Sequence, residues 1–145
     1  MENCIFCKIA ERKANASIID EEKDFMAFMD IYPPTFNGIV TSPNVLVITK
    51  KHYKSNAFED LDENVYSEVM EYARKIAKKI QKSLKPLRVC MVVEGMEIEH
   101  FHIKLYPIFR QHYPGYLSTE KGKDNKGTFA DKDYLDRIAK KIANE

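Results

Sequence analysis

Two histidines and a lysine alternate with apolar residues between positions 100 and 108, a pattern typical of a half-buried strand. Side chains on a strand alternate between its two faces, so His100, His102 and Lys104 should lie on one face, about 7 Å apart. The opposite face would then carry Phe101, Ile103 and Leu105. Such a row of nucleophilic and cationic groups suits an anionic substrate, whereas the alternative is a solvent-exposed strand face that happens to contain two histidines.

A second candidate for chemistry is the pair Cys4 and Cys7. Two thiolates with this spacing usually share a zinc ion with two further nitrogen or sulfur ligands. The sequence offers five candidates for those ligands: His52, His100, His102, His112 and Cys90. The pair can also be redox-active or simply packed, but three cysteines do not form a disulfide framework. Cys90 lies in an apolar run, where a free thiol usually behaves as a small buried hydrophobe, so we assign it no chemistry.

Length and composition predict one domain spanning residues 1–145. The 23 Lys and Arg residues nearly balance 22 Asp and Glu residues, and the net charge of +1 gives no field that would favour nucleic acid. No apolar run approaches the roughly 18 residues of a membrane span, and the first residues lack the features of a secretory signal. We therefore expect a cytoplasmic protein with neither a nucleic-acid nor a membrane partner.

The elements that must position these residues form an α+β pattern. Four apolar segments read as strands, at residues 24–30, 45–49, 88–93 and 101–108, and the turn signal Asn37-Gly38 makes the first two antiparallel neighbours. A long amphipathic helix should begin at a capping box of Asp60 and Glu63 and end at Pro86. Its apolar stripe is Val65, Val69, Tyr72, Ala73, Ile76, Ile80 and Leu84.

The C-terminal part of the chain should contain a loop and a shorter helix. Residues 111–128 are polar and aperiodic, which is typical of a loop or lid. A helix at about residues 131–143 should follow, capped by Asp131. We expect an antiparallel sheet of about five strands with one long helix and one C-terminal helix.

Four motifs in order make the sequence resemble the histidine triad (HIT) family, in its zinc-containing, diadenosine polyphosphate hydrolase-like branch. The motifs are Cys4-Ile5-Phe6-Cys7-Lys8-Ile9, Phe28-Met29-Asp30-Ile31, the run from Val45 to His52, and His100-Phe101-His102. The resemblance implies a structural zinc ion bound by Cys4, Cys7, His52 and His100, and a homodimer. It also implies that His102 attacks the α-phosphate of a nucleotide, that Asp30 binds the ribose, and that an apolar slot surrounds the base. The slot would consist of Phe6, Ile9, Phe28 and Ile31.

The sequence departs from the family pattern at the third histidine, which is Lys104 here, and in the segment 95–99 before the triad. The ammonium of Lys104 can stabilise phosphate oxygens or the leaving group. The resulting hypothesis is a hydrolase or nucleotidyl transferase for purine nucleotide conjugates, with a covalent nucleotidyl-His102 intermediate and Lys104 as a second catalytic residue. The alternatives are a catalytically weak nucleotide-binding or signalling module and a zinc-stabilised scaffold for protein contacts.

Overall fold

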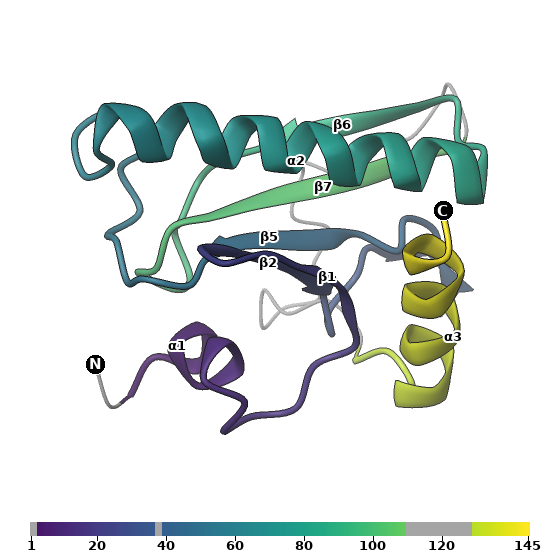
Figure 1. Cartoon of the computed structure of the whole chain (residues 1–145). Coiled ribbons are helices and arrows are strands. Elements are labelled where there is room, and N and C mark those ends of the chain that lie inside the picture. The colour runs from purple at the N-terminus through teal and green to yellow at the C-terminus, as the bar shows by residue number, and fades with distance from the viewer. Residues whose placement is uncertain (1–2, 37–38, 110–128) are drawn as a thin grey trace.

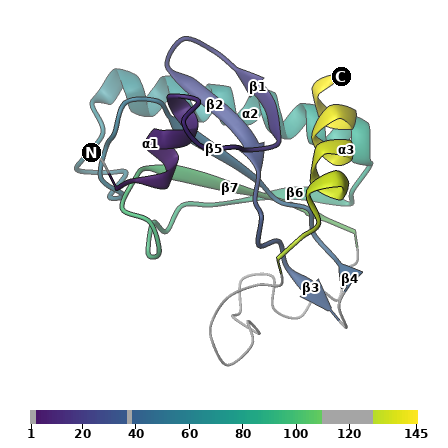
Figure 2. The same cartoon turned by 90° about the horizontal axis from the view of Figure 1, so that it is seen from below.

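A five-stranded antiparallel sheet forms the centre of the structure, a computed structural model that describes residues 3–36, 39–109 and 129–145. The strand order is β1-β2-β5-β7-β6. The bounds are β1 Ile18–Glu21, β2 Phe25–Met29, β5 Val45–Thr49, β6 Arg88–Val92 and β7 His102–Ile108. Between β2 and β5, β3 (Thr35–Phe36) and β4 (Ile39–Val40) form a separate two-stranded sheet that projects from the main sheet (Figure 2).

Helix α2 (Glu63–Leu84) crosses one face of this sheet, and α3 (Lys132–Ala143) packs at one end of it (Figure 1). The side chains of α2 that recur every three or four residues are buried here, including Val69, Ile76 and Ile80. They pack against alternate residues of the strands, such as Val47 and Ile103. This apolar layer is the larger of the two hydrophobic clusters. Because it buries one set of alternate strand residues under α2, the other set must point to the opposite face of the sheet.

The opposite face of the sheet is covered by the short helix α1 (Ile5–Ala10), as Figure 1 shows. Phe6 and Ile9 of α1 pack against Phe28 on β2 and against Leu46 and Ile48 on β5. Because α1 supplies this second cover, all seven residues of β7 are buried, and the strand is not half-buried as its alternation predicts. The sequence analysis predicted neither α1 nor the edge strand β1.

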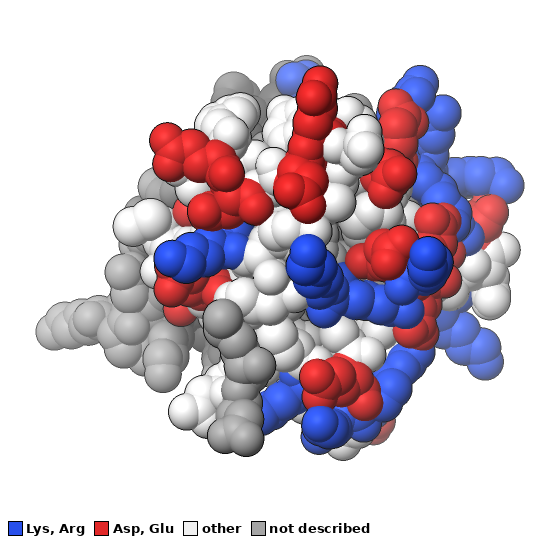
Figure 3. Space-filling view, turned by 60° about the vertical axis from the view of Figure 1, so that its left-hand side comes forward, with Lys and Arg blue, Asp and Glu red and all other residues white. Residues whose placement is uncertain are grey.

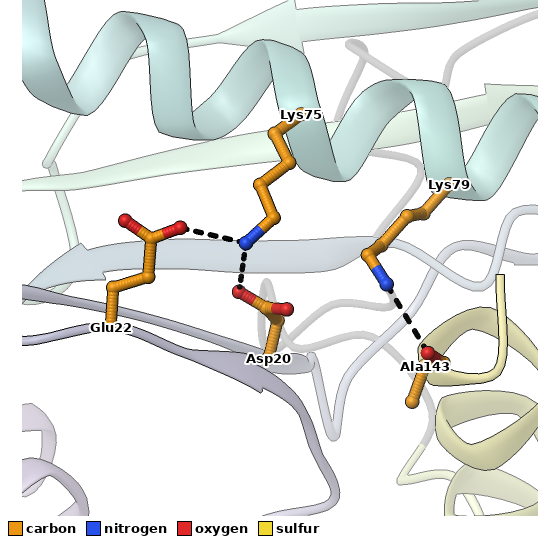
Figure 4. A network of polar contacts seen from close by, with 5 residues as sticks. All are labelled: Asp20, Glu22, Lys75, Lys79 and Ala143. Carbon is orange, nitrogen blue, oxygen red and sulfur yellow. Dashed lines mark hydrogen bonds and ion pairs between the residues drawn. The ribbon is translucent and has the colours of Figure 1, made fainter.

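Polar contacts join β1, α2 and α3 (Figure 4). Lys75 of α2 donates to Asp20 at 3.1 Å and to Glu22 at 2.7 Å. Lys79, one turn further along α2, donates to the main-chain oxygen of Ala143 at 3.2 Å. These contacts hold the edge strand and the C-terminal helix to the long helix.

The predicted start of the long helix is wrong. The helix begins at Glu63 with Asp62 as its N-cap, and Asp60 instead accepts a hydrogen bond from the main-chain N–H of Asn56. Asp60 therefore belongs to the preceding turn, where its carboxylate satisfies a different N–H group. At the other end, Lys85 takes the left-handed conformation (φ 52°) just before Pro86.

The fold class and the other predicted elements agree with the sequence analysis, which did not predict β3 or β4. Strands β2 and β5 pair directly, and β6 pairs with β7. Helix α3 begins as predicted after Asp131, which accepts a hydrogen bond from the N–H of Tyr134.

Cys90 is only half-buried in β6, whereas its apolar sequence surroundings predict a buried thiol. The predicted loop at 111–128, the turn at 37–38 and His112 lie outside the described residues.

Two further features of the structure are the distribution of charge on its surface and the polarity of its helices. Acidic and basic side chains are interspersed on the face shown in Figure 3. Of the helices in the described part of the chain, none combines the length and apolar character that a bilayer crossing requires.

Candidate functional site

Strand β7 places His102 and Lys104 on the face of the sheet that α1 covers. His102 pairs with Ile48 across the ladder and Lys104 with Leu46, and both of these β5 residues belong to the apolar cluster under α1. Phe101, Ile103 and Leu105 lie in the opposite cluster, under α2. The alternation read from the sequence is therefore confirmed, and it leaves His102 only 4% exposed and Lys104 9% exposed.

Four potential metal ligands converge beside this strand. Cys4 and Cys7 lie at the start of α1, His52 follows the end of β5 and His100 precedes β7. Their ligand atoms all lie within 4.8 Å of one another. The Sγ atom of Cys4 is 3.3 Å from Nδ1 of His100, and Sγ of Cys7 is 3.3 Å from Nδ1 of His52. The described residues thus bring together the four ligands that the family resemblance implies.

The sulfur–nitrogen separations in this cluster are close to those of a tetrahedral metal site. Metal–sulfur and metal–nitrogen bonds of ordinary length place S and N ligands roughly 3.5 Å apart in a tetrahedron, close to the observed separations. Nε2 of His100 lies 2.7 Å from the carbonyl oxygen of Thr49 and donates to it, which leaves the Nδ1 lone pair facing the thiols. Burial raises the pKa of the Cys7 thiol to about 11, so a thiolate at this position requires a cation beside it.

The imidazole of His102 is oriented by the main chain and by an aromatic ring. Nδ1 lies 2.7 Å from the carbonyl oxygen of His100 and donates to it, so Nε2 keeps its lone pair. Phe6 of α1 packs edge-on against the imidazole, with 5.2 Å between ring centroids. Burial lowers the pKa of His102, which favours the neutral, nucleophilic form near pH 7.

Lys104 forms an ion pair with Glu94, a residue that the sequence analysis did not single out. Glu94 lies just beyond the end of β6, whose residue Val92 pairs with Lys104. Gly95 follows with a φ of +62°, and a Cβ atom there would lie 2.0 Å from Cβ of Ser55. Only glycine fits this turn, which returns the chain sharply after Glu94. The only sequence signal near this pair is Gly95, a common turn residue, between the apolar segments 88–93 and 101–108.

Asp30, which follows β2, is held by two hydrogen bonds. Its Oδ1 accepts from the main-chain N–H of Tyr32 at 2.9 Å, and its Oδ2 accepts from the side-chain amide of Asn44, also at 2.9 Å. Asn44 is fully buried and was not predicted as a site residue, because nothing in its sequence surroundings distinguishes it from an ordinary turn asparagine. It fixes the carboxylate that the resemblance assigns to ribose binding.

The residues expected to surround a base are only partly brought together. Phe6, Ile9 and Phe28 belong to one buried cluster, and the rings of Phe6 and Phe28 meet edge-on with centroids 5.7 Å apart. Ile31 is 42% exposed and lies just beyond Asp30. Its carbonyl oxygen accepts from the N–H of Ala130, so the segment before α3 lies against this edge of the site.

Comparisons with known proteins place the chain in a family. The family described as "Scavenger mRNA decapping enzyme C-term binding" (DcpS_C) matches residues 3–113. An uncharacterized 16.1 kDa HIT-like protein of Mycoplasma pneumoniae is 31% identical over 110 residues, which are 72% of this chain and 71% of that protein. This chain belongs to the HIT-like family. The resemblance drawn from the four motifs is thereby confirmed.

Solved structures of HIT proteins share the fold. A hypothetical histidine triad nucleotide-binding protein from Sulfolobus tokodaii superposes with a TM-score of 0.76 at 23% identity, covering 97% of this chain and 90% of that one. A Zn-bound histidine triad family protein from Mycobacterium smegmatis gives 0.72 at 19%, with coverages of 99% and 92%. A HIT family hydrolase from Legionella pneumophila gives 0.59 at 25%, with coverages of 80% and 99%.

Proposed function

We propose that this HIT-like protein is a hydrolase or nucleotidyl transferase that acts at the α-phosphate of purine nucleotide conjugates. The observation that carries the proposal is the state of His102, a buried imidazole whose Nδ1 is bound to the His100 carbonyl and whose Nε2 keeps its lone pair. The description of the Legionella relative as a hydrolase and of the Sulfolobus relative as nucleotide-binding supports this reaction class.

In the proposed reaction, Nε2 of His102 attacks the α-phosphorus, and the bond to the leaving group breaks with its electron pair going to that group. Water then attacks the phosphorus of the nucleotidyl-histidine, and the P–N bond breaks with its electron pair returning to Nε2. The leaving group takes up a proton from solvent and the attacking water releases one, so the two steps together consume one water molecule. Lys104 lies two residues along the same face of β7, where its ammonium stabilises negative charge on the phosphate oxygens or the leaving group.

The residues around His102 supply nucleotide binding in this proposal. Asp30, fixed by Asn44, accepts hydrogen bonds from the ribose hydroxyls. The base packs against the apolar side of the site. That side consists of Phe6, Ile9, Phe28 and Ile31.

We further propose that Cys4, Cys7, His52 and His100 bind one structural zinc ion. The S···N separations and the orientation of His100 fit such an ion, and the Mycobacterium relative is described as Zn-bound. Four protein ligands leave no open position for water, so zinc would hold α1 against the sheet rather than activate a nucleophile.

The covalent intermediate gives the direct test of the proposed function. The protein is mixed with an adenosine 5′-phosphoramidate, quenched in denaturant within one turnover, and measured by intact-protein mass spectrometry. We expect an added mass of one adenylyl group, which peptide mapping places on His102. Turnover without any adduct on His102 would contradict the covalent mechanism.

The ion pair of Lys104 with Glu94 supports a second candidate function, a nucleotide-binding or signalling module without useful catalysis. A lysine whose ammonium is already paired is less available to a departing group. Calorimetric binding of adenosine monophosphate, with neither an adduct nor turnover of any conjugate, would favour this module over the enzyme.

We also propose that the protein forms a homodimer through the outer edge of β6. Among the described residues this strand ends the sheet, and Leu87 just before it and Met91 within it are more than half exposed. An unpaired strand edge with exposed apolar residues is suited to pairing with a second copy. Light scattering should give the mass of two chains in solution, and a single-chain mass at micromolar concentration would contradict the dimer.

A further inference from the structure

Glu94 places a carboxylate beside Lys104, the residue that stands where the family pattern has its third histidine. Its partner Lys104 is largely buried, with a side chain 11% exposed, whereas the Glu94 side chain is 42% exposed. The carboxylate therefore lies on the solvent side of the ammonium. A leaving group that departs past Lys104 toward solvent would therefore pass close to Glu94.

The position of Glu94 is fixed by the fold around it. The pairing of Val92 with Lys104 sets the register of the two strands. Val93 packs against the large cluster under α2, which turns the following residue toward the other side of the sheet. The turn at Gly95, closed against Ser55, then keeps the chain from extending further.

Among the charged groups that act on His102 are the ammonium of Lys104 and the carboxylates of Asp30 and Glu94. Two of these three groups are negative. The phenol of Tyr106, further along β7, agrees with this balance. Its pKa is raised chiefly by burial, and then by the carboxylates of Asp30, Glu94 and Glu97.

This balance has opposite consequences for different leaving groups. A polyphosphate brings several negative charges toward Glu94 and must compete with its carboxylate for the ammonium of Lys104. A leaving group with an amine or another cation is attracted by the same carboxylate. At separations of a few ångströms in a partly buried site, a unit charge changes such energies by an amount worth about tenfold in rate.

We propose that Glu94 is a specificity-determining residue, which makes the site select nucleotide conjugates with neutral or cationic leaving groups and discriminate against polyphosphates. This inference rests on the proposed hydrolase function and specifies its substrate class. Glu94 acts through charge: it pairs with Lys104 in the free protein and faces the leaving group in the complex.

The test compares two substrates and two variants. One substrate is adenosine monophosphate joined through a phosphoramidate bond to ethylenediamine, whose second amine is charged, and the other is diadenosine triphosphate. Glu94→Gln removes the charge at nearly constant size, and Glu99→Gln makes the same change at an exposed position of the same segment. The quantity measured is the ratio of kcat/KM for the two substrates, because intrinsic reactivity cancels when this ratio is compared between variants.

We expect Glu94→Gln to shift the ratio about tenfold toward diadenosine triphosphate at low salt, with a smaller shift at about 0.5 M salt, where exposed charges are screened. Glu99→Gln should leave the ratio within about twofold of the wild type. Equal ratios for the wild type and Glu94→Gln would overturn the role of Glu94 while leaving the hydrolase intact. Absence of turnover of both substrates by the wild type would overturn the proposed function and this inference together.

Discussion

Replacing His102 with alanine is expected to lower kcat/KM for an adenosine phosphoramidate by at least about 10³-fold, because the substitution removes the proposed nucleophile. In hydrolases, loss of the catalytic nucleophile usually leaves only the rate that binding and electrostatic stabilisation supply. Steady-state kinetics, with the product identified as the nucleoside monophosphate, measures the effect. The buried imidazole also packs against Phe6, so the fold of the variant must be checked separately.

Ile103→Val is the matched control for this experiment. Ile103 neighbours His102 on β7 but faces the large cluster under α2. The control should lose about 0.5–1.5 kcal/mol of unfolding free energy with turnover near the wild-type value. If the His102→Ala protein folds, binds metal and still turns over at the wild-type rate, another residue is the nucleophile.

A second large effect is expected at the metal cluster. Cys7→Ser removes one of four ligands, and we expect it to abolish stoichiometric zinc binding and to lower the free energy of unfolding by about 4 kcal/mol, the contribution of a ligand present at roughly 1,000 times its dissociation constant. Without the ion, α1 loses its attachment to His52 and His100 and should separate from the sheet. Hydrogen exchange should accordingly accelerate in α1, while the amides of α2 remain protected until global unfolding.

Cys90→Ser is the control for cysteine chemistry in general, since Cys90 lies on β6 and outside the cluster. It should keep one zinc ion per chain, measured by elemental analysis, and an unfolding midpoint close to that of the wild type. Chelation of the wild-type protein should reproduce the exchange pattern of Cys7→Ser. Equal zinc content in Cys7→Ser and Cys90→Ser would show that Cys4, Cys7, His52 and His100 are not a zinc site.

The local pattern of the sequence determined which side chains share a face. The strict alternation at 100–108 separated His102 and Lys104 from Ile103, and the stripe on the long helix identified the side that packs on the sheet. Both follow from the fixed geometry of strands and helices, which depends only on neighbouring residues. The cysteine spacing likewise indicated a metal site, although the choice of His52 and His100 as partners came from the family resemblance.

The tertiary structure decided what comes together across the chain. The six-residue helix α1 carries no recognisable period, yet it covers the second face of β7 and makes the site buried. The contacts of Lys104 with Glu94 and of Asp30 with Asn44 depend on strand register and on the turn at Gly95. Periodicity records the direction of a side chain relative to its own element, but a contact between elements is set by how loops and strand pairs place them, so these partners became visible only in the folded chain.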